Sequence, residues 1–207
     1  MTTGERRNLD SLRALASALA PRPVVLITTL STDGVLNVAP FSMVMPLSAE
    51  PPLLALGISP RGDGGVKATL RNLLDTGEFV VNTVSQALLE SAVAASLDDG
   101  PPPAGRFQTM PSERVRPPRL VGAVAQLECR LAEVFRPRGS GTRLVTGEVV
   151  RIHIGDTLLP DELGPPAEAL TGHLEMEAPG IHRFLVGGSP LRVTAKGSGV
   201  ADARRDE

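Results

Sequence analysis

The most conspicuous shortage in the sequence is that of aromatic side chains. Its 207 residues include no tryptophan, no tyrosine and only five phenylalanines. Hydrophobic residues still make up 42% of the chain, so the core must be built from valine, leucine, alanine and isoleucine. Proteins that bind single-stranded nucleic acids stack the bases on aromatic rings. The shortage of such rings therefore argues against that class of protein.

An excess of charge of one sign is also lacking. Lys and Arg number 21 and Asp and Glu number 23, which leaves a formal net charge of −2. Nucleic-acid-binding domains normally carry an excess or a stripe of basic residues. We therefore expect no nucleic-acid partner.

The chain has one cysteine, Cys129, and no apolar run of about 18 residues, the length that a membrane span requires. One cysteine cannot form an intrachain disulfide, which fits a reducing compartment. Glu5, Arg6 and Arg7 precede a segment that is too short and too polar for a signal peptide. We therefore expect a cytoplasmic protein that has no membrane segment.

Motifs for metal binding and nucleophilic catalysis are missing as well. His153, His173 and His182 are far apart in the sequence, and neither HExxH nor CxxC occurs, so a metal site would have to be assembled from distant residues. No GxSxG motif is present. Cys129 lies on the apolar face of a predicted strand, which favours a buried, inert thiol over a nucleophile. We therefore assign no metal ligand and no catalytic side chain.

Glycine and proline, in contrast, are abundant, with 21 and 19 residues. This excess is typical of a turn-rich β protein rather than a helical bundle, and the length fits one domain or at most two small ones. Asp33-Gly34 is a two-residue hairpin signal, and Gly77 is well placed to end a helix. Loops are expected over 98–105 and 156–180, with a short terminal segment at 182–195.

Hydrophobic periodicity predicts about six or seven strands and three short helices. This content favours a closed β-barrel over a doubly wound sheet. The expected strands are 24–30, 35–39 with a continuation over 41–45 after a bend at Pro40, 53–59, 79–84, 121–135 and 144–154, and the expected helices are 9–20, 66–74 and 86–97.

Two polar clusters could carry binding chemistry. The first, RGDGGVKAT at 61–69, is a glycine-rich loop that runs into a helix, where backbone N–H groups and the helix dipole favour an anion. Arg61, Lys67 and Thr69 would add two charges and a hydroxyl. The spacing matches neither a Walker motif nor GxGxxG, so by itself it favours an ordinary solvated loop before a capped helix.

The second cluster, Asn37, Ser42 and Ser48, interrupts an apolar β segment. Polar groups in such a place need partners, because burying them unsatisfied costs about 1–3 kcal/mol each. Hydrogen bonds within turns near Pro40 are one explanation. A ring-shaped ligand with several donors and acceptors, lying along the strand, is the other.

A set of short stretches, each weak alone, occurs in a specific order along the chain. These stretches are Arg22-Pro23-Val24 leading into Ile27-Thr28-Thr29, the Asp-Gly hairpin followed by Asn37 and Ala39-Pro40-Phe41-Ser42, Ser48 ahead of Pro51-Pro52-Leu53, Lys67 and Thr69 followed by Arg71-Asn72 and the segment 77–82, and the segments 111–120, 127–131 and 147–156. Together they resemble the flavin-reductase-like family of FMN-binding split-barrel proteins over residues 20–196.

The resemblance implies a mainly β fold, a six-stranded antiparallel Greek-key split β-barrel with flanking helices. It implies a single domain over 1–207, with a core of about 20–196 and frayed ends at 1–8 and 197–207, and it implies a homodimer. One FMN per protomer would bind in a groove at or near the dimer interface. FAD is the alternative flavin, and the short phosphate loop favours FMN.

Residue by residue, the resemblance places the flavin ring and ribityl chain along β-segment residues and the phosphate at the glycine-rich loop. The ring and ribityl residues would be Asn37, Ser42, Met43, Val44 and Ser48, and the phosphate residues would be Ser59, Arg61, Lys67 and Thr69. His182 and Arg183 are further candidates near the flavin, with solvated turn residues as the alternative. Ser189-Pro190 stands where relatives commonly have a tyrosine, and Phe107 where many have a glycine-leucine pair, so the substrate side of the pocket departs from the family pattern.

The function implied is that of an NAD(P)H-dependent flavin oxidoreductase. Hydride would pass from the nicotinamide to the flavin and then to an acceptor or to a partner monooxygenase. The alternative is a non-catalytic FMN-binding or electron-transfer module with little NAD(P)H turnover. Because the sequence has no dinucleotide fingerprint, the use of NAD(P)H rests on the resemblance alone.

Overall fold

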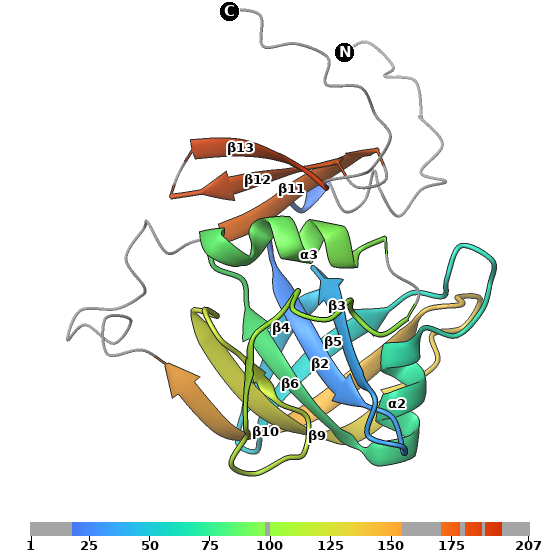
Figure 1. The fold of residues 1–207 in the computed structure, drawn as a ribbon. Coiled ribbons are helices and arrows are strands. Elements are labelled where there is room, and N and C mark those ends of the chain that lie inside the picture. Colours follow the sequence, from blue (N-terminus) through green and yellow to red (C-terminus); the bar gives the residue numbers. More distant parts are fainter. Residues whose placement is uncertain (1–17, 98–99, 155–170, 179–180, 188, 196–207) are drawn as a thin grey trace, which may run out of the picture.

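The computed structural model describes residues 18–97, 100–154, 171–178, 181–187 and 189–195. Seven strands form one antiparallel sheet in the order β3-β2-β6-β9-β10-β5-β4. The strands are β2 (Val25–Leu30), β3 (Leu36–Phe41), β4 (Val44–Ala49), β5 (Pro52–Ile58), β6 (Glu78–Thr83), β9 (Ala125–Phe135) and β10 (Arg143–Ile154). Figure 1 shows that this sheet curls into a barrel, and its two edges are the consecutive strands β3 and β4. The mainly β antiparallel fold is confirmed, with seven strands in the barrel sheet rather than six.

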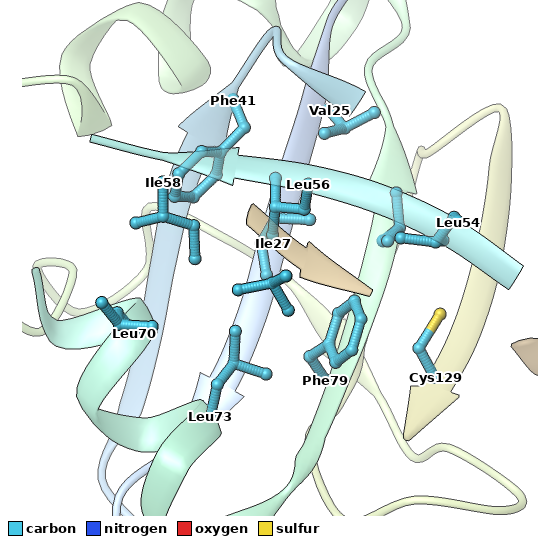
Figure 2. Packing of buried hydrophobic residues seen from close by; sticks show 12 residues of the cluster. Val25, Ile27, Phe41, Leu54, Leu56, Ile58, Leu70, Leu73, Phe79 and Cys129 are labelled. Atoms are coloured by element: carbon cyan, nitrogen blue, oxygen red, sulfur yellow. The ribbon is translucent and has the colours of Figure 1, made fainter. Parts of the chain in front are cut away.

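The barrel encloses an aliphatic core, as the composition requires. Ile27, Leu56, Phe79 and Val145 are fully buried there, together with Cys129, which confirms that this thiol is inside the barrel (Figure 2). Phe79 fits because the facing position on β10 is Gly147, where any Cβ would overlap the ring. Burial raises the pKa of the Cys129 thiol, which keeps it protonated.

Helix α2 (Ala68–Thr76) closes one end of the barrel. Leu70 and Leu73 pack into the core, and the helix ends at Gly77 with a left-handed φ of 69° and its N–H donated to the Leu73 carbonyl. The predicted role of Gly77 is therefore confirmed. The helix begins two residues later than the sequence suggested, because Lys67 is extended and serves as its N-cap.

A second, smaller sheet has the order β1-β11-β12-β13. Its strands are β1 (Arg22–Pro23), β11 (Thr171–Ala178), β12 (Ile181–Val186) and β13 (Ser189–Thr194). Helix α3 (Leu89–Ala95), preceded by the short 3-10 turn η1 (Gln86–Leu88), lies between this sheet and the barrel (Figure 1). Val93 of the helix, Leu26 of the barrel and Phe184 of the small sheet share one buried cluster.

The small sheet is where the sequence prediction was incomplete. Part of the segment expected as a polar loop, 156–180, forms β11, and the terminal segment 182–195 forms a hairpin. A third sheet, in which β7 (Thr109–Met110) pairs with β8 (Arg119–Leu120), was also not expected. The strand predicted over 121–135 begins only at Ala125, since Gly122 is in a turn with φ 83°. The predicted helix at 9–20 falls mostly outside the described residues.

No helix in the described part of the chain is long and apolar enough to cross a membrane.

Candidate flavin site

A cavity of about 280 Å³, which we call the phosphate pocket, lies between β3 and the start of α2. Arg61, Lys67 and Thr69 line it from the glycine-rich loop and the helix, and Asn37 lines it from β3. The loop is a compact turn in which Arg61 and Gly65 are joined by a 2.9 Å backbone hydrogen bond. The structure thus brings together residues of both polar clusters at the positive end of a helix dipole.

A buried hydrogen-bond network fixes the polar floor of the phosphate pocket. The Asn37 side-chain amide donates to the hydroxyl oxygens of Thr29, at 3.2 Å, and Thr69, at 3.1 Å. Asn72 donates to the same Thr29 oxygen at 3.0 Å. Because the Thr69 oxygen accepts from Asn37, its own O–H can be donated to an anion in the pocket. Sequence reasoning missed Thr29 and Asn72, although Asn72 lies one helical turn after Thr69.

The cations of the pocket already have neighbours. Arg61 forms an ion pair with Asp63 of its own loop, at 3.2 Å. The backbone N–H of Gly65, together with Arg61, lowers the pKa of the exposed Asp63 carboxyl. The Lys67 ammonium lies 5.5 Å from the centre of the Phe41 ring, a cation–π arrangement. An anion entering the pocket would compete with Asp63 for Arg61.

A second cavity, the histidine pocket, adjoins the first and shares Pro40 and Ser96 with it. Its volume is about 120 Å³, and residues of α3, the end of β3 and the small sheet line it. The predicted residues Ser42 and His182 line it, together with His173, which the sequence prediction missed. His173 belongs to β11, within the segment expected as a loop, and only the pairing of β11 with β1 brings it opposite Arg22.

Hydrogen bonds connect the polar residues of the histidine pocket. Arg22 Nη2 lies 2.7 Å from His173 Nδ1, and Arg22 Nε donates to the Ser42 hydroxyl at 3.4 Å. His173 Nε2 lies 3.0 Å from His182 Nδ1. Burial, the neighbouring His182 and the positive Arg22 together lower the pKa of His173 to about 4, and burial lowers that of His182. Both rings are therefore neutral at pH 7.

The remaining predicted residues lie elsewhere. Val44 and Ser48 line a mainly apolar pocket at the barrel end, together with Met45 and Ile152. The other three predicted positions have separate neighbours: Met43 packs against Gly57, the Ser59 hydroxyl lies 3.3 Å from that of Thr142, and Arg183 is exposed on β12. The predicted set is thus divided among the phosphate pocket, the histidine pocket, the barrel end and these three positions.

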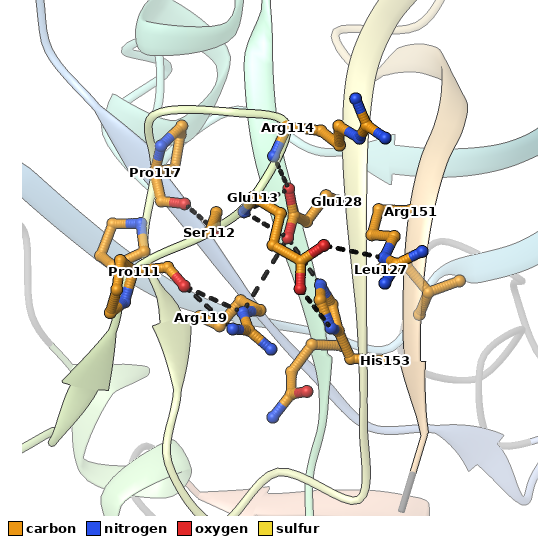
Figure 3. Close-up of polar contacts among 12 residues, drawn as sticks. Pro111, Ser112, Glu113, Arg114, Pro117, Arg119, Leu127, Glu128, Arg151 and His153 are labelled. Atoms are coloured by element: carbon orange, nitrogen blue, oxygen red, sulfur yellow. Dashed lines mark hydrogen bonds and ion pairs between the residues drawn. The ribbon is translucent and has the colours of Figure 1, made fainter.

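Outside these pockets, β9 carries a wholly buried carboxylate, that of Glu128. Glu128 accepts backbone N–H bonds from Glu113, at 2.9 Å, and Arg114, at 2.6 Å, and its Oε1 lies 2.7 Å from His153 Nε2 (Figure 3). Burial raises the pKa of Glu128, but these hydrogen bonds outweigh it and leave the pKa below its ordinary value. Because its oxygens accept these backbone N–H groups and Arg119 Nε lies 3.9 Å from Oε1, we interpret the cluster as the anchor of the 111–120 segment. No three metal-ligating side chains come together among the described residues.

The chain matches the family described as the flavin reductase like domain over residues 17–167. It belongs to this family. An uncharacterized protein of Aquifex aeolicus is 35% identical to it over 160 residues, which cover 74% of this chain and 80% of the relative.

Two solved structures have the same fold. Pseudomonas fluorescens 2-nitrobenzoate 2-nitroreductase NbaA has a TM-score of 0.73 at 23% identity, with 99% of each chain covered. Nitrilotriacetate monooxygenase component B from Bacillus cereus has a TM-score of 0.71 at 25% identity, with 95% of this chain and 96% of that chain covered. The predicted family and the split-barrel fold are thereby confirmed, and a flavin-related oxidoreductase activity follows at the level of the family.

Proposed function

We propose that the protein is an FMN-binding, NAD(P)H-dependent oxidoreductase. The observation that carries this proposal is the phosphate pocket, in which Arg61, Lys67 and Thr69 meet Asn37 at the start of α2. The pocket offers two cations, a hydroxyl and the positive end of a helix to a dianionic phosphate. A monophosphate suits this single compact pocket better than a pyrophosphate, which favours FMN over FAD.

The rest of the flavin would extend from the phosphate pocket along the end of β3. Backbone groups at residues 42–44 would face the pyrimidine edge of the ring, and donors there would stabilise the negative charge that reduction places on it. Bound flavin supplies the hydride chemistry, while the chain binds, orients and shields it. No side-chain acid or base is assigned to the hydride step.

The physiological form is proposed to be a cytoplasmic homodimer that passes its reducing equivalents to an acceptor or to a partner monooxygenase. The likeness to a monooxygenase component B supports such a partner. The fully buried single thiol is in keeping with a reducing compartment.

The test is an absorption spectrum of purified protein after incubation with FMN and desalting, followed by addition of NADH or NADPH without oxygen. Because the chain has no tryptophan or tyrosine, flavin absorption would dominate its spectrum. We expect about one FMN per chain and rapid bleaching of its visible band. Retained FMN without bleaching would favour the electron-transfer module instead, and a colourless protein would contradict flavin as a resident cofactor.

A further inference from the structure

The Thr29 hydroxyl is the shared acceptor of the network beneath the phosphate pocket. Thr29 lies on β2 directly opposite Asn37 on β3, and its side chain is wholly buried. Its Oγ1 accepts one amide hydrogen from Asn37, at 3.2 Å, and one from Asn72 of α2, at 3.0 Å. These two bonds use both lone pairs of the hydroxyl oxygen. A single atom of Thr29 therefore joins the edge of the barrel sheet to the helix.

The same bonds determine where the proton of Thr69 points. The Asn37 amide nitrogen has two hydrogens, of which one is donated to Thr29 and the other to Thr69 Oγ1, at 3.1 Å. A reversed amide would place its oxygen against Thr69 and draw the Thr69 O–H inward, away from an anion in the pocket. Thr29 supplies one of the two bonds that favour the orientation observed, so Thr29 keeps the Thr69 O–H available to the pocket.

Thr29 and Asn72 also hold the first turn of α2, although neither of them lines the phosphate pocket. The start of this helix has no side-chain cap and no acidic residue in its first turn. The N–H groups of an uncapped first turn have no partner within the helix and can be donated to a ligand. The bond from Asn72 to Thr29 fixes that turn against the sheet, with Thr69 at the pocket.

We propose that Thr29 and Asn72 are positioning residues for the flavin phosphate. They hold Asn37 and Thr69 so that the Thr69 hydroxyl is donated to a phosphate oxygen. The inference rests on the proposed function, because it requires the phosphate to occupy this pocket. It goes further by assigning part of the selectivity for a phosphorylated flavin to two buried residues that do not touch the ligand.

The test compares the affinities of the full chain for FMN and for riboflavin, which has the same ring and ribityl chain but no phosphate. Quenching of flavin fluorescence measures both. Wild-type protein should bind FMN at least about tenfold more tightly. Thr29→Val keeps the shape of the side chain but removes the shared acceptor, so this ratio should fall about fivefold, the effect of one ordinary hydrogen bond. Thr29→Ser, which restores the hydroxyl, should restore the ratio. A merely structural role would weaken both flavins alike.

Thr28→Val is the matched control. Thr28 is the neighbouring residue of β2 and is also wholly buried, but its side chain lies on the other face of the strand and donates to the Pro118 carbonyl at 2.7 Å. This variant loses a buried hydroxyl from the same strand without touching the network. It should lower stability as Thr29→Val does, and it should leave the ratio of FMN to riboflavin affinity unaltered.

Asn72→Ala tests the network from the helix, since it removes the second donor to Thr29, and it should lower the ratio as well. An unaltered ratio in Thr29→Val would overturn the inference, and an unaltered ratio in Asn72→Ala would do so if Thr29→Val does not fold. An equal fall of the ratio in Thr28→Val would also overturn it. These results would leave the proposed function standing if wild-type protein prefers FMN. Equal wild-type affinities for FMN and riboflavin would instead refute the phosphate pocket on which the proposed function depends.

Discussion

At the scale of single residues, Lys67 is the clearest test of the phosphate pocket. It supplies a charge at the N-cap of α2, where the helix dipole already favours an anion. We expect Lys67→Ala to weaken FMN binding tenfold or more, about 1.4 kcal/mol. Equilibrium dialysis against FMN measures this directly. The control is Arg71→Ala, which removes an exposed cation from the same helix and should have little effect.

Thr69 separates binding from folding at the same site. Thr69→Val removes the hydroxyl proposed for the phosphate and also takes one acceptor from the buried Asn37 amide. It should therefore lower both FMN affinity and stability, whereas Lys67→Ala should lower affinity alone. Full FMN affinity in both variants would show that the phosphate binds elsewhere.

The lowered pKa of His173 predicts that the stability of the protein depends on pH. Its pKa is lowered to about 4 in the folded protein from an ordinary value of 6.5, so the unfolded chain binds more protons between these values. The contribution of His173 to the free energy of unfolding should therefore be fully present above pH 6.5 and be lost as the pH falls toward 4. Urea denaturation at several pH values measures the slope. In His173→Gln the decline should be shallower, with His182 contributing what remains, and an equal slope would contradict the assignment.

Site residues could be predicted from the sequence where they lie close to one another along the chain. Arg61, Lys67 and Thr69 lie within nine residues of one another, so a loop before a helix indicated their shared pocket. Asn37 was suspected as a polar residue in an apolar strand. Arg22 and His173, in contrast, are 151 positions apart. Only the β1–β11 pairing joins them, and no local pattern encodes that contact.

At the scale of elements, the Glu128 cluster shows how one buried charge holds the loop between β7 and β8. The carboxylate accepts the N–H groups of Glu113 and Arg114, which no strand pairs. Glu128→Gln would turn an amide donor toward at least one of these donors. We expect a loss of about 2–4 kcal/mol in the free energy of unfolding. Glu113→Gln, which changes only a half-exposed side chain, is the matched control and should cost less than about 1 kcal/mol.

Most barrel strands were foreseeable because they bury apolar residues, whereas β4, which has no buried residue, and the small sheet were not. β13 has one buried side chain, Val193, among six residues, so its pattern resembles a loop. It exists because it completes a sheet that packs on α3, which is a tertiary cause. Helix α3, in contrast, could be predicted, since its run of Ala and Leu is buried on two sides.

Stability equal to wild type in Glu128→Gln would mean that neighbouring residues, and not the buried carboxylate, hold the 111–120 segment.

At the scale of the whole molecule, the family resemblance implies a homodimer, and the surface of the barrel end supports it. β4 is an edge strand, and its side chains Met45 and Leu47 are 57% and 49% exposed. Met45 lines the apolar pocket at the barrel end, together with Ile152. An exposed apolar edge strand is a surface that proteins normally cover. A second copy of the chain is the occupant that we expect.

Leu47→Asp tests this expectation, since a charge in the centre of an apolar interface disfavours association. Light scattering should give wild-type protein a mass twice that of the chain and Leu47→Asp a mass nearer to one chain. Leu74→Asp, which places the same charge on a somewhat more exposed leucine of α2, should remain dimeric. Because the resemblance places the flavin near the interface, Leu47→Asp should also weaken FMN binding, although Leu47 does not line the phosphate pocket. A monomeric wild-type protein that binds one FMN per chain would show that the cofactor site does not require a dimer.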